Sequence, residues 1–391
     1  MSTSREIVDL LVRGGKAPRM ALCESPWGDT LAAWVRQGYP TRIEYREAGA
    51  NRWRPEDGGW EKIEVAGEYE VPVPPEEHFG FDLHMTGGLF DIMPLRGVNE
   101  TVEETAEWAI RRNGAGASLK WWKHKSGTPE HIAFRMTSRE IWERDYRPHL
   151  LGADPARLRD MKNRRKKLAR AAAAGKWICF GELFIWELAR ASMGDVTLYE
   201  NLLLDPGWIR DYGRVYTDFF KTHFTLAFAE LGKPDGVLLA EDLGYRNGLF
   251  VSPEVLRELI FPFYAELVSF FHDLGLPVIL HSCGSVVDAL PLIVEAGFDA
   301  LNPMERKAHG NDPFLFAERY GERLAFFGGL DARLFETNDS DLIGREIEKY
   351  LAGMKARGAR LIFASDHSLS PMVRYETYLR ALDVYRRHMW Y

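Results

Sequence analysis

The chain of 391 residues has little cysteine: only Cys23, Cys179 and Cys283. An odd and low number excludes a disulfide framework, so the sequence predicts a reduced, cytoplasmic protein. No stretch approaches the roughly 20 consecutive apolar residues that a transmembrane helix needs. The N-terminal residues also lack the pattern of a secretory signal. We therefore expect no association with a membrane.

A strong excess of charge of one sign is also missing, since 50 Lys and Arg face 57 Asp and Glu, for a net charge of -7. This mild acidity argues against a general nucleic-acid binder. Residues 160–174 are the exception, with Lys162, Arg164, Arg165, Lys166, Lys167 and Arg170. Such a run is typical of the solvated face of a helix; the alternative is a docking patch for an acidic partner protein.

Internal repeats and low-complexity linkers are absent too, and the pattern changes near residue 175. Before it, short helices are predicted at 4–13, 30–37 and 137–146, and strands at 118–123 and 131–136. Alternating runs punctuated by Gly and Pro predict hairpins between 41 and 74. Residues 103–112 suggest a helical turn or a strand connection.

After residue 175, short apolar runs alternate with amphipathic segments. The predicted strands are 177–180, 237–240, 277–281, 298–302, 324–328 and 360–365. The predicted helices are 252–274, 285–296, 312–320, 340–358 and 375–388. Strands that are apolar throughout are typical of sheets buried on both faces, and their alternation with helices predicts a parallel sheet.

Ionisable or amide side chains follow five of these strands in succession. They are Glu241, Asp242, His281, Cys283, Asn302, Glu305, Asp331, Asp366 and His367. In a TIM barrel all strand ends converge on one mouth, whereas an open sheet gathers only those near a switch point. We therefore expect an α/β protein with a (β/α)8 TIM barrel and N-terminal helical and hairpin additions. Residues 1–391 would form a single domain, with the additions and first barrel elements in 1–175 and regular units in 176–391.

The pair His281-x-Cys283 is the strongest local feature. Residues i and i+2 of a strand point to the same side, so this imidazole and thiolate can reach one ion, and both are good zinc ligands. His367 is the best candidate for a further ligand, with Asp366 orienting it or binding directly, and Glu241 is the best carboxylate, with Asp242 next. The alternative is that these side chains only pack, cap or brace loops.

The predicted metal ligands are therefore Glu241, His281, Cys283 and His367. The predicted catalytic residues are Glu241, Asp242, His281 and Cys283. Residues just past strand ends, or aromatic residues that suit a flat apolar pocket, are predicted to bind substrate: Trp27, Trp186, Tyr245, Asn302, Glu305 and Asp331. For the aromatic residues, the alternative is a place in the core.

Four blocks of this chain resemble the uroporphyrinogen decarboxylase superfamily. They are Leu239-Ala-Glu-Asp-Leu-Gly-Tyr, His281-Ser-Cys-Gly, Ala300-Leu-Asn-Pro-Met-Glu and Phe327-Gly-Gly-Leu-Asp. The resemblance covers residues 175–391 well and the N-terminal half more loosely, through His78-Phe-Gly-Phe-Asp. It implies a TIM-barrel fold. One branch of the superfamily decarboxylates uroporphyrinogen without a cofactor, and the other contains corrinoid-dependent methyltransferases that bind zinc through His-x-Cys and a later ligand.

The chain resembles the methyltransferase branch because it has His281-x-Cys283. It also lacks the arginine-rich N-terminal signature of the decarboxylases, since residues 19–27 are Arg-Met-Ala-Leu-Cys-Glu-Ser-Pro-Trp. Thiol-methylating members carry a second Cys as the late ligand, where this chain has His367. Fewer thiolates leave a metal ion more Lewis-acidic, which favours polarising an ether oxygen.

The resemblance thus implies a zinc-dependent enzyme that moves a methyl group from a methoxylated, aromatic small molecule to a corrinoid protein. Zinc and a corrinoid carried by that partner are the expected cofactors. The alternatives are methyl transfer from a corrinoid to a thiol similar to coenzyme M, and decarboxylation of uroporphyrinogen or a similar acid. A scaffold without activity is disfavoured, because a scaffold has no reason to gather so many polar strand ends.

Overall fold

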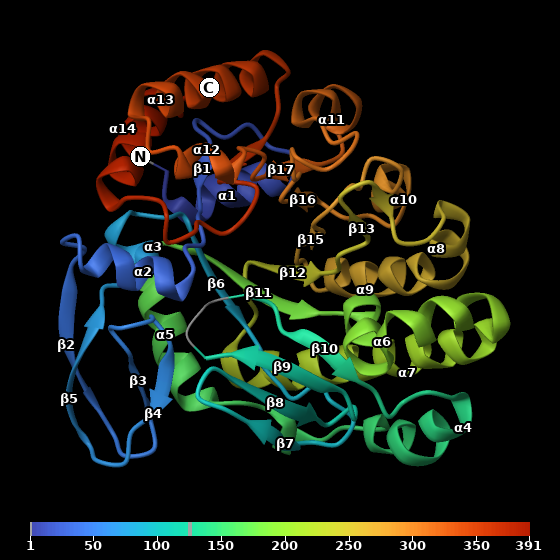
Figure 1. The fold of residues 1–391 in the computed structure, drawn as a ribbon. Helices are drawn as coiled ribbons and strands as arrows, with labels where there is room; N and C mark the ends of the chain where they lie inside the picture. Colours follow the sequence, from blue (N-terminus) through green and yellow to red (C-terminus); the bar gives the residue numbers. More distant parts are fainter. Residues whose placement is uncertain (1, 124–126) are drawn as a thin grey trace.

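The computed structural model describes residues 2–123 and 127–391, and its main feature is an eight-stranded parallel sheet (Figure 1). In sheet order the strands are β1 (Ala21–Leu22), β18 (Leu361–Phe363), β17 (Ala325–Phe327), β16 (Ala300–Asn302), β15 (Val278–His281), β12 (Gly236–Ala240), β11 (Trp177–Leu183) and β6 (Leu83–Gly87). All neighbours pair in parallel. The six strands predicted after residue 175 are all present.

The sheet closes through Asp82, which lies directly before β6. Its backbone N–H donates to the carbonyl of Leu22 in β1 at 2.7 Å. Its carboxylate accepts the Leu22 N–H at 2.7 Å and is held by the Arg19 guanidinium. A side chain thus replaces ladder bonds between the two outer strands, and the predicted (β/α)8 TIM barrel is confirmed.

Helices connect the barrel strands and cover the outside of the sheet (Figure 1). They are α5 (Met161–Ala173), α6 (Ile185–Leu204), α7 (Pro206–Leu231), α8 (Pro253–Leu259), α9 (Phe261–Asp273), α10 (Leu290–Glu295), α11 (Pro313–Tyr320), α12 (Ala332–Glu336), α13 (Ser340–Ala356) and α14 (Tyr375–His388). The helix predicted over 252–274 is interrupted at Ile260, and α6 and α7 were not predicted. None of the helices in the described ranges is long and apolar enough to cross a membrane.

Alternate residues of the strands pack into two different cores. Ile279 of β15 packs in the interior of the barrel with Leu238 of β12 and Ile362 of β18. Val278 and Leu280 of β15 pack in the larger core between sheet and helices. Both faces of the strands are therefore apolar, which explains the continuous apolar runs in the sequence.

The N-terminal part adds smaller elements, as predicted. Helix α1 (Ser4–Val12) inserts apolar residues into the barrel interior. The remaining elements are α2 (Gly28–Val35), β2 (Thr41–Arg46), β3 (Asn51–Trp53), β4 (Trp60–Lys62), β5 (Gly67–Pro72), α3 (Pro75–His78), β7 (Asn99–Glu104), β8 (Trp108–Asn113), β9 (Ser118–Trp122), β10 (Glu130–Ala133) and α4 (Arg139–Ile141). Residues 103–112 are the end of one strand, a turn and most of the next, not a helical turn.

The basic segment forms α5, and part of its charge has a structural role. Arg164 donates to the hydroxyl of Thr86 and to the carbonyl of Gly88, and Arg165 pairs with Glu230. These two arginines brace neighbouring elements of the barrel, which accounts for part of the charge run without an acidic partner.

Candidate functional site

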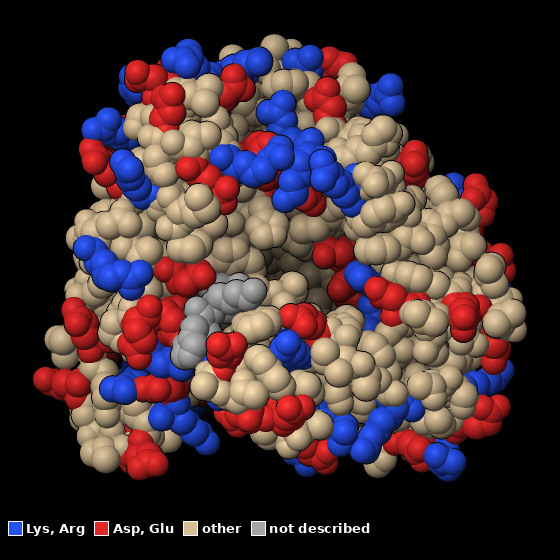
Figure 2. All heavy atoms as spheres, in the orientation of Figure 1, with Lys and Arg blue, Asp and Glu red and all other residues tan. Residues whose placement is uncertain are grey.

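The inward or outward direction of each strand residue decides which polar groups meet at the mouth. Because every second residue faces the same side, the interior position of Ile279 puts His281 on the inner side of β15. The same rule puts Asp242 inward, two positions beyond Ala240 and four beyond Leu238. Figure 2 shows a hollow in this face of the molecule, near the strands that Figure 1 labels β12 and β15.

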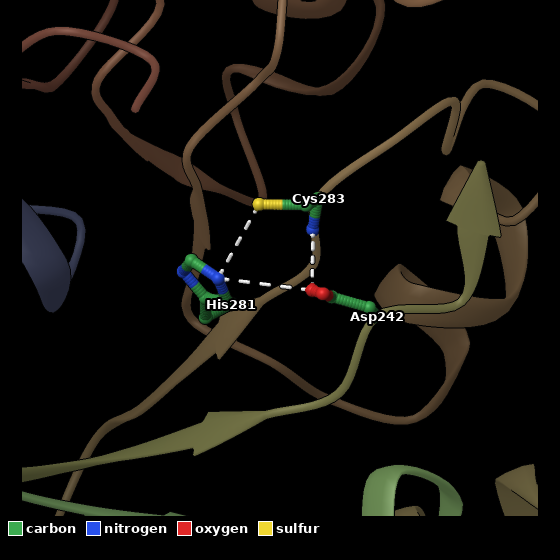
Figure 3. Close-up of side chains that lie close together, drawn as sticks. All are labelled: Asp242, His281 and Cys283. Atoms are coloured by element: carbon green, nitrogen blue, oxygen red, sulfur yellow. Dashed lines mark hydrogen bonds and ion pairs between the residues drawn. The ribbon is translucent and has the colours of Figure 1, made fainter. Parts of the chain in front are cut away.

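Asp242, His281 and Cys283 lie together at these strand ends (Figure 3). The Cys283 Sγ is 3.6 Å from His281 Nε2, which is 3.7 Å from Asp242 Oδ1. One ligand atom from each residue lies within 4.8 Å of the other two, and all three side chains are half-buried. In the described ranges this is the one group of His, Cys, Asp or Glu with the spacing of a metal site.

Asn302 at the end of β16 orients His281. Its Oδ1 lies 2.5 Å from His281 Nδ1, while its amide nitrogen donates to the carbonyl of Phe327 at 3.1 Å. Since that amide nitrogen is engaged, the oxygen faces the ring and accepts the Nδ1–H. The lone pair of His281 is then on Nε2, the nitrogen that faces Asp242 and Cys283. This is the arrangement that orients a histidine ligand toward a metal.

The loop after β15 is fixed by backbone contacts. The Cys283 N–H donates to Asp242 Oδ1 at 2.8 Å, and the Gly284 N–H donates to Glu305 Oε2 at 2.7 Å. Gly284 has φ +74, and a Cβ there would lie 2.3 Å from the carbonyl oxygen of Gly244. Only glycine allows this approach, so the sequence Cys283-Gly284 has a geometric reason.

The environment of Cys283 disfavours a free thiolate. Burial, followed by the charges of Asp242 and Glu305, raises the pKa of the thiol well above its usual value. A thiolate is nevertheless the form that binds a metal. Without a bound cation Cys283 is therefore held as the neutral thiol, and metal binding there would release its proton.

The structure does not bring Glu241, a predicted ligand, into this group. Glu241 faces outward like Leu239, and its oxygens accept the N–H groups of Phe184 and Trp186 and the hydroxyl of Tyr264. Burial raises its pKa to about 8. Its place between sheet and helices makes it a structural acceptor, and the neighbouring Asp242 is the carboxylate that lies with His281 and Cys283.

His367, the other predicted ligand, also lies outside the group. It is exposed, and its ring lies 6.0 Å from that of Trp27. The buried residue at this strand end is Asp366, which accepts the N–H groups of Arg306 and Ala332. Asp366 continues the inward series of Ile362, so alternation turns His367 away.

Among the residues predicted to bind substrate, Trp186 and Asp331 make structural contacts, whereas Tyr245 is exposed. Trp186 is fully buried and donates its Nε1–H to the carbonyl of Asp242 at 2.7 Å, so it supports the group from behind. Tyr245 is 47% exposed and lies beside Phe250, with ring centroids 5.6 Å apart. Asp331 caps α12 and pairs with Arg333. Tyr245 is therefore the better placed of these three to contact a ligand.

Sequence reasoning missed Lys307, which pairs with Glu305 at 3.1 Å and contributes to the electrostatics of Cys283. Its position two residues after Glu305, in the block that follows β16, was the available signal. Asn302 was predicted as a substrate contact, whereas the structure places it against His281.

Comparisons with known proteins agree with this fold. Residues 230–388 match the family model described as uroporphyrinogen decarboxylase (URO-D). A methyltransferase from Methanosarcina mazei has a similar structure, with a TM-score of 0.64 and 14% identity over 99% of both chains. A 3-keto-D-glucoside 4-epimerase from E. coli is much less similar, with a TM-score of 0.36 and 12% identity over 58% of this chain and 84% of that one. No curated protein matches.

The likeness to the Methanosarcina structure supports the barrel fold, and the family match covers β12, the loops around Asp242, His281 and Cys283, and every later barrel strand. Residues 230–388 of this chain are therefore similar to the uroporphyrinogen decarboxylase family, and the whole chain shares its fold with the Methanosarcina protein.

Proposed function

We propose that this chain is a zinc-dependent methyltransferase that takes a methyl group from a methoxylated, aromatic small molecule and passes it to a corrinoid protein. The observation that carries the proposal is the group of Asp242, His281 and Cys283. The likeness in fold to a methyltransferase supports the reaction class.

The three donor atoms suit zinc in kind, and two of the three separations between them match the spacing of its ligands. Zinc takes N, O and S ligands at about 2.0–2.3 Å, so tetrahedral ligands stand about 3.3–3.7 Å apart. The separations of 3.6 Å from Cys283 to His281 and 3.7 Å from His281 to Asp242 lie at the upper end of that range. Three protein ligands would leave one position for substrate, as in catalytic zinc sites.

The donor set also favours an ether oxygen as the group that is activated. A bound zinc ion would supply a Lewis acid for the oxygen of the methoxy group. Within the described group only Cys283 contributes sulfur, so less charge is donated to the ion than two thiolates would donate. Asp242, His281 and Cys283 would hold the ion, and Asn302 would keep Nε2 of His281 directed at it.

Metal analysis of the purified full-length protein tests the ligand set. We expect one zinc per chain in the wild type and its loss in His281→Ala and Cys283→Ser, with weaker binding in Asp242→Asn. Glu241→Gln and His367→Ala are matched controls that should retain zinc, because their side chains lie outside the group. Stoichiometric zinc in both His281→Ala and Cys283→Ser would overturn the proposal.

The reaction is tested by spectroscopy of cobalt methylation, with a reduced corrinoid protein and a panel of methoxy compounds. Methylation of cobalt that requires Cys283 supports the proposed direction. Loss of methyl from methylated corrinoid to a thiol, with no reaction of any ether, would assign the thiol-methylating alternative.

A further inference from the structure

Two basic side chains, Lys307 and Arg333, lie in the segments that follow β16 and β17, the next strands beyond β15 in the sheet. Lys307 lies five residues beyond the end of β16, and Arg333 belongs to α12, which follows β17. Figure 2 shows basic side chains gathered on the rim of the hollow, over the region of α12, β16 and β17 in Figure 1. Neither residue belongs to the group of proposed metal ligands.

Lys307 is connected to Cys283 by a short series of contacts. Its ammonium group lies 3.1 Å from Glu305 Oε1, and the other oxygen of Glu305 accepts the N–H of Gly284, next to Cys283. The Arg333 guanidinium, with a smaller contribution from Lys307, holds the pKa of Asp331 below its usual value, so both cations act on the same carboxylate.

Both cations retain hydrogen-bond donors. An ammonium group has three N–H donors and a guanidinium five. Lys307 is 37% exposed with one ion pair, to Glu305, and Arg333 is 60% exposed and uses Nε and Nη2 on Asp331. The acidic groups beside them are engaged with backbone N–H groups, as in Glu305 with Gly284 and Asp366 with Arg306 and Ala332. A ligand that enters the mouth thus meets available donors from the cations.

We propose that Lys307, with Arg333 acting on the same acidic side chains, binds an anionic group, such as a carboxylate, of a small molecule whose other end lies at Cys283. If the proposed function holds, the methyl donor is an anionic methoxy compound, and Lys307 determines that specificity. The anion site itself depends only on the placement of Lys307, so it can be tested without metal or methyl transfer.

The test compares alkylation of Cys283 by iodoacetate, a carboxylate, and by iodoacetamide, its neutral analogue. Full-length protein is freed of metal with a chelator, and the rate at Cys283 is followed by peptide mass spectrometry. Cys23 and Cys179 are buried and separable by peptide. A change in the pKa of the thiol alters both rates equally, so their ratio isolates attraction of the anion.

We expect Lys307→Met to lower the ratio of iodoacetate to iodoacetamide about five- to tenfold relative to the wild type, the size of one nearby, partly screened charge. Lys307→Arg should keep the wild-type ratio, and Arg333→Met should lower it less. Lys349→Met, which removes an exposed lysine of α13, is the control and should change nothing. The difference between wild type and Lys307→Met should shrink at 1 M salt.

An equal ratio in wild type and Lys307→Met would overturn the anion site. That result is separate from failure of the proposed function, which is judged by zinc content and cobalt methylation. A zinc-free protein with a ratio dependent on Lys307 would keep the anion site and lose the methyltransferase. A zinc-binding protein whose ratio does not depend on Lys307 would keep the proposed metal site and overturn the anion site.

Discussion

At the scale of single residues, Asn302 has the clearest influence on the candidate metal site. Its amide fixes the tautomer of His281 by accepting from Nδ1 and donating to the carbonyl of Phe327. A leucine at this position has similar volume but neither polar group. The Nδ1–H of His281 and the carbonyl of Phe327 would then lose their partner, and the ring would be free to turn.

We therefore predict that Asn302→Leu lowers zinc affinity about 10- to 100-fold, the usual effect of removing such a supporting contact. Competition with a chromophoric chelator measures it. Asn302→Asp keeps an oxygen acceptor for Nδ1–H and should bind zinc more tightly than Asn302→Leu. Equal affinity in the wild type and a folded Asn302→Leu would show that the contact does not orient a ligand.

At the scale of elements, carboxylates at strand ends tie each loop of the mouth to its neighbour. Asp242 after β12 accepts from Cys283 after β15, and Glu305 after β16 accepts from Gly284. Glu24 after β1 accepts from Ser365 after β18. Buried N–H groups need such partners. The row of strand-end acids in the sequence thus has a structural role as well as a chemical one.

The contact of the β15 loop with Gly244 gives a second prediction. Gly284→Ala should destabilise the protein about 1–3 kcal/mol more than Gly358→Ala, measured by urea unfolding of metal-free protein. Both glycines have positive φ, so both variants bear about 1–2 kcal/mol of backbone strain. Only at Gly284 does a Cβ meet backbone, since nothing lies within 4 Å at Gly358. Equal losses of unfolding free energy in the two variants would mean that the loop after β15 moves aside freely.

At the scale of the whole molecule, burial of strand-end acids makes stability depend on pH. Burial raises the pKa of Glu24 and of Glu182 to about 7 from 4.5. Between these values the folded state binds more protons than the unfolded state. Stability contributed by the protonated acids is therefore present at low pH and is lost as pH rises from about 4.5 through about 7.

Glu182→Gln tests this, because glutamine keeps an oxygen for the Leu89 N–H that Glu182 accepts. We expect the unfolding free energy of the variant, relative to that of the wild type, to rise by up to about 3 kcal/mol from pH 5 to pH 8. This follows from the shift in the pKa of Glu182. Unfolding free energies at the two pH values measure the gain. Glu376→Gln, at an exposed pair with Arg380, should show no such pH-dependent gain. If Glu182→Gln changed the unfolding free energy by the same amount at both pH values, the raised pKa of Glu182 would be contradicted.

The sequence by itself determined the barrel, because its physical signals are local. Apolar runs alternating with helices specify buried parallel strands, and polar residues after each run mark their carboxyl ends. It also determined that His281 and Cys283 share a side, since their spacing matches the period of a strand. The additions before residue 175 were predictable as hairpins but not in their pairing.

Only the tertiary structure decided which acid joins His281 and Cys283. Glu241 and Asp242 are adjacent, and both faces of β12 are apolar, so the sequence does not show which face is the interior. Packing settles it: Leu238 and Ala240 lie inside, and Asp242 follows them, while Glu241 follows Leu239 toward the helices. The same alternation puts Asp366 inward and leaves His367 exposed. Asn302 and Lys307 gained their roles only when parallel strands brought them beside residues far away in the chain.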